Sequence, residues 1–485
     1  MLQHTFSNAS NGQPRRLVAQ ASCLHGLQTG SLRYVILFAI AMLVLITVKS
    51  SYSQNYGQIP ATPQAQPVAL IGATVHPVSA APIANATVVF DQGKIVALGQ
   101  NIAIPSNARR IDAKGKHVYP SLIAANTTLG LIEIGAVRAT NDMSETGAIN
   151  PNVRAEVAVN PDGEMIPVTR SNGVALAVSV PQGEIISGTS ALLMLDGWTW
   201  EQMTMKAPLG MQVNWPNMTL RRGGFFGPQQ SEEEQRKQME ENLKQLKEAF
   251  AAGRAYMKAK EAEAQKGAAY HETDARWDAM IPVLKKEIPV FVSANEVKQI
   301  QAAVQWAEDE NLRLVIVGGR DSWRVARLLK EKNVAVVYGQ VHDLPSRAWE
   351  AYDTPFTTPK KLHEAGVKFC LANFDNSNVR NLPYEAATAS AYGLPKEEAL
   401  KSITLHAAEI LGVDDRVGSL AVGKDATLFI TTGDPLEITT QVERVFIQGR
   451  DIDLGDKHKA LYRKYSEKYR QLENAGSGAK PAGTN

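Results

Sequence analysis

Short apolar runs alternate with amphipathic stretches through the middle of the chain. Six runs have the length and β-branched content of buried strands: VALAVSV (174–180), SALLMLD (190–196), PVFVSA (289–294), LRLVIVGG (312–319), VAVVYGQV (334–341) and VKFCLAN (367–373). Stretches with helical periodicity, such as 296–311 and 322–333, lie between the later runs. Apolar strands alternating with amphipathic helices predict βα units around a buried parallel sheet.

Two further patches of short β-type runs stand near opposite ends of the chain. The first covers 68–118 and is punctuated by Gly, Pro and Asn turn formers, and the second contains DATLFITTG (425–433) and ERVFIQGRDI (443–452). Because the ends of a domain often lie close together, these two patches can pair into one small sheet.

One segment, 231–265, interrupts this rhythm with a long charged helical pattern. Ser231 and Glu234 have the spacing of a capping box at its start. Two interpretations remain open, a solvated surface helix or an interaction helix. Its narrow apolar stripe consists of Met239, Leu243, Leu246, Phe250 and Met257.

The N-terminal region carries an uncharged apolar run, Tyr34–Val48, flanked by Arg33 and Lys49. The run is short for a spanning helix, which needs about 20 residues, and it fits a signal peptide with cleavage before Gln54. The alternative is an uncleaved membrane anchor at residues 34–48. In either case we expect the folded part to lie outside the cytoplasm, in the periplasm or the extracellular space.

Charge and cysteine content exclude several classes of protein. The 51 Lys and Arg against 49 Asp and Glu leave a formal charge of +2, so nucleic-acid binding is not expected, and contact with a membrane is expected only through the N-terminal apolar run. The only two cysteines, Cys23 and Cys370, cannot form a disulfide framework or a Cys-based zinc site.

Two segments near the ends of the folded part are informative together. The first, at 93–130, is GKIVALGQNIAIPSNARRIDAKGKHVYPSLIAANTTLG, and the second, at 397–437, is EEALKSITLHAAEILGVDDRVGSLAVGKDATLFITTGDPLE. They resemble the entry and exit segments of the amidohydrolase superfamily, in the manner of imidazolonepropionase-like metal-dependent hydrolases. The resemblance implies an α/β fold, a (β/α)₈ TIM-like barrel with a composite β-sandwich, and a site at the C-terminal ends of the barrel strands.

The resemblance also sets the expected domain organisation. It comprises a signal peptide or anchor (1–53), a linker (54–67), a first sandwich part (68–118), the barrel (119–418) with a helical insertion at about 231–265, a second sandwich part (419–455), and a C-terminal helix with a tail (456–485).

The family's metal ligands are mostly replaced in this chain. The resemblance implies zinc or another divalent metal held by His and Asp side chains. The paired His of the first strand would fall at Asn126 and Thr128, and the next two at Ser293 and at Gly318 or Gly319. Only the last-strand acid, Asp375, has a counterpart, so the expected site has Asp375 as its catalytic residue and no metal ligands.

Other polar side chains are candidates to replace the missing metal ligands. Of the nine His, only His342 directly follows a predicted strand, and a lone His there is either a ligand or a loop residue. An oxygen-only cation site and solvated loop acids are both compatible with the carboxylates near predicted strand ends, which are Glu133, Asp142, Glu145, Asp196 and Asp375.

The segment 373–385, NFDNSNVRNLPYE, is a candidate pocket loop. Arg380 is expected either to bind a substrate carboxylate or to tie the loop to Asp375 or Glu385. Asn126 and Thr128 are expected to contact the substrate. Two aromatic residues upstream, Trp198 and Trp200, either wall a pocket or belong to the core.

Two functional classes therefore stay open. The first is hydrolysis of non-peptide, cyclic-amide-type C–N bonds at an atypical site. The second is a catalytically inactive member of the fold, acting in binding or as the partner subunit of an active homologue. The expected partner is a small-molecule substrate or ligand, and homo-oligomers are possible.

Overall fold

The computed structural model describes residues 59–220, 230–263 and 269–477. The predicted signal peptide or anchor lies outside the described residues. Within the described ranges, none of the helices combines the length and the apolar character needed to cross a membrane. The cysteine that these ranges contain, Cys370, is buried as a free thiol, and burial raises its pKa.

Eight strands form a nearly closed barrel in which each strand pairs with the next along the chain. The first and last strands lie near each other, and the Thr127 hydroxyl donates to the Asp375 carbonyl across that seam at 3.1 Å. The strands are β6 (Leu122–Thr127), β7 (Val174–Ser179), β8 (Ile186–Met194), β9 (Thr204–Asn214), β10 (Val290–Ala294), β11 (Leu314–Gly318), β12 (Ala335–Gly339) and β13 (Phe369–Ala372).

One barrel strand runs against all the others. β8 is antiparallel to both β7 and β9, whereas the remaining neighbours are parallel. The expectation of uninterrupted βα units is therefore wrong between 174 and 214. Only residues 180–185 connect β7 to β8. A parallel β8 would need a crossover connection of about a dozen or more residues. The end of β8 consequently lies at the opposite end of the barrel from the other strand ends.

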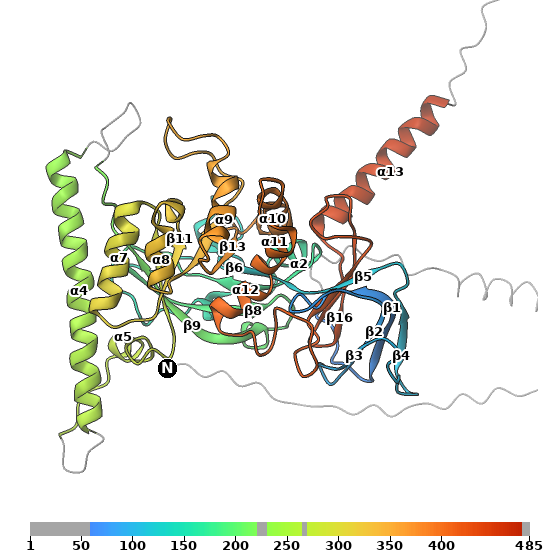
Figure 1. Cartoon of the computed structure of the whole chain (residues 1–485), viewed down its shortest axis with the longest axis horizontal. Coiled ribbons are helices and arrows are strands. Elements are labelled where there is room, and N and C mark those ends of the chain that lie inside the picture. Colours follow the sequence, from blue (N-terminus) through green and yellow to red (C-terminus); the bar gives the residue numbers. More distant parts are fainter. Residues whose placement is uncertain (1–58, 221–229, 264–268, 478–485) are drawn as a thin grey trace, which may run out of the picture. The chain divides into compact units, whose positions relative to one another are not determined.

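Helices α7 to α12 follow the later strands and lie along the outside of the barrel (Figure 1). Shorter helices fill the earlier connections. The helices of the barrel are α2 (Met165–Arg170), α3 (Trp200–Met203), α5 (Ala275–Asp278), α6 (Ile281–Leu284), α7 (Val297–Asp309), α8 (Ala326–Glu331), α9 (Thr354–Glu364), α10 (Leu382–Ala391), α11 (Lys396–Ser402) and α12 (Leu405–Leu411).

The long charged segment folds as α4 (Glu232–Glu263). Its start carries the predicted reciprocal bonds, Ser231 N–H to Glu234 Oε2 at 2.7 Å and Glu234 N–H to Ser231 Oγ at 3.2 Å. Phe250 from its apolar stripe is fully buried and meets the Trp306 ring of α7 edge-on, with 4.9 Å between ring centroids. This stripe therefore covers the barrel helices.

The two terminal patches join into a second sheet, as their pattern predicted. β5 pairs with β14, so strands from the two ends of the chain lie side by side. Description of this part as a sandwich remains a prediction. The strands are β1 (Val68–Val75), β2 (Ile83–Asp91), β3 (Lys94–Gly99), β4 (Arg109–Asp112), β5 (His117–Pro120), β14 (Leu428–Thr431), β15 (Val442–Ile447) and β16 (Arg450–Ile452), and α13 (Lys457–Ser477) follows them.

Candidate functional site

The C-terminal ends of the parallel barrel strands carry neutral polar groups. Asn126 is buried on β6, Thr128 follows that strand half-buried, and Ser293 is half-buried near the end of β10. Gly318 ends β11 with φ of 88°, and a Cβ at this position would clash with the Asn295 amide. A His side chain therefore fits poorly at that strand end. We call this set of strand ends the barrel mouth.

Asp375 follows β13, the last strand, where the family's acid is expected. Its carboxylate accepts hydrogen bonds within its own loop. Oδ1 accepts from the Ser377 N–H at 2.5 Å, and Oδ2 accepts from the Asn378 side-chain amide at 2.8 Å. The structure thus places this carboxylate at the barrel mouth as an acceptor that shapes a turn.

Among the described contacts, Arg380 is not paired with Asp375 or Glu385, and its role toward a substrate carboxylate stays a prediction. Its guanidinium donates to the Ser377 carbonyl, and its own carbonyl accepts from the Asn172 side chain at 2.7 Å. These contacts fix the loop that carries Asp375 to itself and to the segment before β7. A substrate carboxylate would have to compete with the Ser377 carbonyl for this cation.

Glu385 has a buried carboxyl group beside the barrel mouth. It is not among the site residues expected from the sequence. It is 1% exposed, and its oxygens accept from the Val341 N–H at 2.8 Å and from the Asn373 amide. Burial raises its pKa to about 7, and these hydrogen bonds offset only part of that effect. The sequence carries little signal for this residue, because an acid in the first turn of a helix is common.

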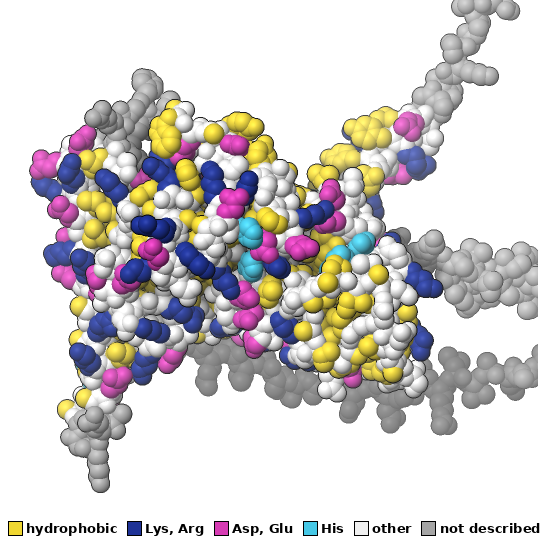
Figure 2. Space-filling model, viewed as in Figure 1, with side chains coloured by type: hydrophobic (Ala, Val, Ile, Leu, Met, Phe, Trp, Pro, Cys, Tyr) yellow, Lys and Arg dark blue, Asp and Glu magenta, His cyan; other side chains and the backbone are white. Residues whose placement is uncertain are grey.

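His342 does not face a cluster of ligands. Its Nε2 lies 2.7 Å from the Thr388 hydroxyl of α10, and partial burial lowers its pKa. Histidine side chains appear at two places on the face drawn in Figure 2. His76 and His117 are 2.9 Å apart in the terminal sheet, while His363 and His406 flank Glu398 on the outer helices.

The donor set at the barrel mouth does not fit the divalent metal that the family fold implies. Zinc sites in proteins use imidazole, thiolate or carboxylate ligands, and three or more are needed. Within the described residues, no group of three or more His, Cys, Asp or Glu side chains is arranged to hold a metal ion. Asn126, Thr128 and Ser293 offer only neutral oxygens, which are weak ligands for zinc.

The candidate carboxylates other than Asp375 fall in three places. Asp142 and Glu145 line an open cavity of about 600 Å³ formed by the connection between β6 and β7, and Arg154 lines it too. Glu133 hydrogen-bonds Asn160 at 3.4 Å, and burial raises its pKa. Asp196 is not at the barrel mouth at all, because it follows the reversed strand β8. No oxygen-only cation site unites these acids.

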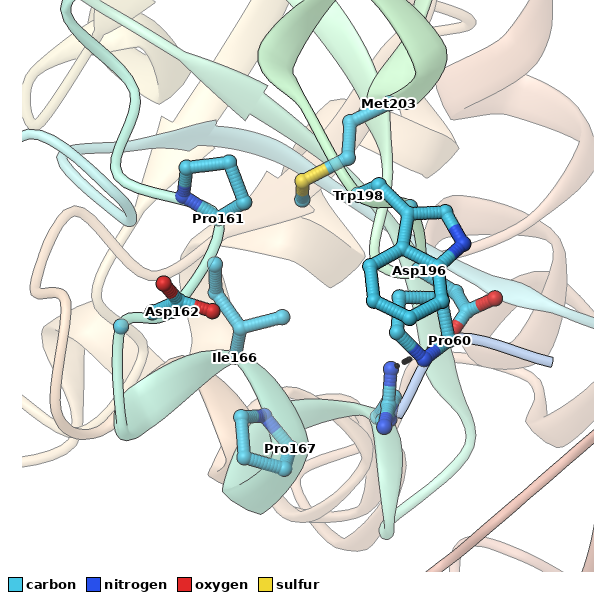
Figure 3. A pocket seen from close by; sticks show the side chains of 11 residues that line it. Pro60, Pro161, Asp162, Ile166, Pro167, Asp196, Trp198 and Met203 are labelled. Carbon is cyan, nitrogen blue, oxygen red and sulfur yellow. Dashed lines mark hydrogen bonds and ion pairs between the residues drawn. The ribbon is translucent and has the colours of Figure 1, made fainter. Parts of the chain in front are cut away.

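At the opposite end of the barrel, Asp196 is part of a buried ion-pair network. Its carboxylate accepts from Arg170 at 2.9 Å and from Arg450 at 2.7 Å. The two tryptophans that follow Asp196 differ in their solvent exposure. Trp198 is 63% exposed and walls a pocket (Figure 3), whereas Trp200 is half-buried and packs against the core.

This arrangement defines an eight-stranded barrel of the hydrolase type with an accessory sheet from both chain ends. The sequence model of the amidohydrolase family matches residues 202–452, more than half of the chain. The chain therefore belongs to the amidohydrolase family. The match begins after β6, so Asn126 and Thr128 lie outside it.

Known proteins agree with this assignment. The chain is 20% identical to amidohydrolase tasK of Hapsidospora irregularis over 381 residues, which are 71% of this chain but only 37% of that protein. A crystal structure of an amidohydrolase from Thermotoga maritima MSB8 has a TM-score of 0.71 and 28% identity, covering 80% of this chain and 99% of its own. A Xaa-Pro dipeptidase with bound methionine, 14% identical with a TM-score of 0.50 and covering 80% and 100%, shares the fold alone.

Proposed function

We propose that this amidohydrolase-family chain binds a small molecule of the cyclic-amide type at the barrel mouth and does not carry out metal-assisted hydrolysis. The observation that supports the proposal is the replacement of ligand-type side chains by amides and hydroxyls at the strand ends, at Asn126, Thr128 and Ser293. The family's scissile group is polarised by a metal-bound water, and these residues cannot anchor such a metal.

Amide and hydroxyl side chains suit recognition of an amide. A ring amide presents one N–H donor and one carbonyl acceptor side by side, and an Asn side chain offers the complementary pair. Asn126 is buried on β6, so a hydrogen bond there is shielded from water. The cavity lined by Asp142, Glu145 and Arg154 next to β6 and β7 gives a polar ligand further partners.

Hydrolysis at an atypical site is the second candidate, and one observation favours it. Asp375 is retained at the expected last-strand position, and Glu385, with a pKa of about 7, lies one helix further on. A carboxyl that titrates near neutral pH has the right acidity for proton transfer. Its burial and its two hydrogen bonds hold it away from a ligand in this conformation.

Binding and turnover can be separated with one probe, hydantoin. Isothermal titration calorimetry of the purified chain tests binding, and mass spectrometry of the same samples tests ring opening. We expect saturable binding without ring opening, and about tenfold weaker binding for Asn126→Ala. The matched control, Gln305→Ala on the exposed side of α7, leaves binding unchanged. Ring opening that disappears in Asp375→Ala would favour hydrolysis instead.

A further inference from the structure

The helix that follows the terminal sheet, α13, is exposed on all sides over most of its length. Lys457 at its start forms an ion pair with Glu164, which ties that end to the segment before α2. Every residue from Tyr462 to Asn474 is exposed, so none of the described segments covers this part of α13, which is red in Figure 1. Helices in proteins gain most of their stability by burying an apolar face, and a bare helix of this length is marginal in water.

Four large side chains form a stripe along the exposed part of α13. They recur at intervals of three or four residues and therefore share one face of the helix, and they are Tyr462, Tyr465, Tyr469 and Leu472. Their exposed fractions lie between 48% and 75%. Single exposed apolar side chains are ordinary, whereas a row of them on one helix face indicates a surface that another body covers. We call this row the tyrosine stripe.

Positive charge surrounds the tyrosine stripe. α13 contains six Lys or Arg residues and two Glu, a formal charge of +4, whereas the whole chain carries only +2. Lys468 is three residues from Tyr465 and four from Leu472, so it stands beside the stripe. Lys464 Nζ lies 5.9 Å from the centre of the Tyr465 ring. The near-neutral charge of the whole chain thus conceals a basic helix with an aromatic face.

We propose that α13 docks on the surface of an anionic phospholipid bilayer, with the tyrosine stripe at the boundary between headgroups and acyl chains. Helices that lie on membranes combine an apolar or aromatic face with a polar face rich in Lys and Arg. A Tyr ring suits this depth because its body enters the apolar layer while its hydroxyl stays hydrated. Lys464 and Lys468 extend their stems along the stripe and place their ammonium groups at the lipid phosphates.

A second copy of α13 is the other occupant whose spacing matches the stripe. Two such helices would each bring a charge of +4 to the contact and would repel each other. The stripe also covers only about two heptads, whereas a coiled coil usually needs three to four. The charge of α13 therefore favours an anionic surface over a copy of itself.

Hydrogen–deuterium exchange of the full-length chain tests the contact. The N-terminal apolar run is also expected to contact membranes, so the readout is amide exchange in peptides from α13 and not co-sedimentation of the chain. Vesicles of phosphatidylglycerol and phosphatidylcholine in about equal parts should slow this exchange about tenfold or more, and pure phosphatidylcholine vesicles should not. Unchanged exchange with the anionic vesicles, or equal slowing by both, would overturn the proposal. Slowing without lipid that grows with protein concentration would assign the stripe to a second copy and overturn it too.

Variants separate the stripe from the charge. Tyr465→Ser with Tyr469→Ser removes two rings and keeps the helix propensity, because Ser and Tyr have similar propensities. Half-maximal slowing should then need about tenfold more lipid. Lys468→Gln should need several-fold more lipid, whereas its control, Arg463→Gln, should need little more, because Arg463 has no stripe residue three or four positions away.

The substituted side chains are all exposed, so the barrel should stay folded in every variant, which an unchanged urea midpoint checks. Equal weakening by Lys468→Gln and Arg463→Gln, or full slowing in the double Tyr variant, would contradict docking through the tyrosine stripe. The proposal is independent of the function proposed at the barrel mouth.

Discussion

The two ends of the barrel differ in the side chains that their strand ends carry. At the barrel mouth, where a hydrolase of this fold keeps its chemistry, the strand ends carry amides, hydroxyls and glycines. At the distal end, Asp196 is 2% exposed and bonded to two arginines. These buried charges of the distal end join the barrel to the terminal sheet through Arg450 on β16.

The difference shows that a buried carboxylate at a strand end is not by itself a mark of catalysis. The two carboxyl groups differ in whether a charged partner compensates their burial. Asp196 is matched by Arg170 and Arg450, so its burial is compensated. Glu385 accepts hydrogen bonds from neutral donors, Val341 and Asn373, and burial raises its pKa.

The largest expected effect comes from removing Asp196. Asp196→Ala leaves Arg170 and Arg450 without their shared carboxylate and should lower the free energy of unfolding by about 3–5 kcal/mol. Asp375→Ala at the barrel mouth should cost about 1 kcal/mol, because it loses only turn contacts. Urea denaturation of both variants measures the difference. Equal losses would contradict the contrast between the two ends.

A smaller effect is expected from the pH dependence of Glu385. Its pKa is higher in the folded protein than in the unfolded chain, so the folded state binds the proton more tightly. The stabilisation by the protonated form is fully present below about pH 4.5 and is lost as pH rises through about 7, by roughly 3 kcal/mol at most. The difference between wild type and Glu385→Gln in denaturation at pH 5 and pH 8 reports this loss. A difference that does not change with pH would show that the carboxyl is not the titrating group.

How far the sequence predicts this molecule differs between its parts. The strands at 289–373 and the joining of the terminal patches follow from periodicity and turn residues. The reversal of β8 could have been inferred from the short connection at 180–185, which excludes a crossover. The expectation of uninterrupted βα units puts Asp196 among the acids at one set of strand ends, and the reversal of β8 moves it to the other end. The pairing of Asp196 with Arg170 and Arg450 depends on packing between segments that are distant in the sequence. No local sequence pattern predicts this pairing.

The smallest effect concerns the barrel seam. Thr127 is fully buried, and its hydroxyl donates to the Asp375 carbonyl and accepts from the Leu129 N–H at 3.0 Å. Thr127→Val keeps the shape but leaves two groups unpaired, so we expect a loss of about 1–2 kcal/mol in urea denaturation. Thr273→Val at an exposed position before α5 is the control. A neutral Thr127→Val would mean that the seam is not held by this hydroxyl.

Metal content tests the central claim most directly. The purified chain is incubated with an excess of zinc, passed through a desalting column and analysed by inductively coupled plasma mass spectrometry. Because the strand ends present Asn126, Thr128 and Ser293 in place of metal ligands, the account predicts far less than one zinc per chain. One tightly held zinc per chain, lost in Asp375→Ala, would contradict it.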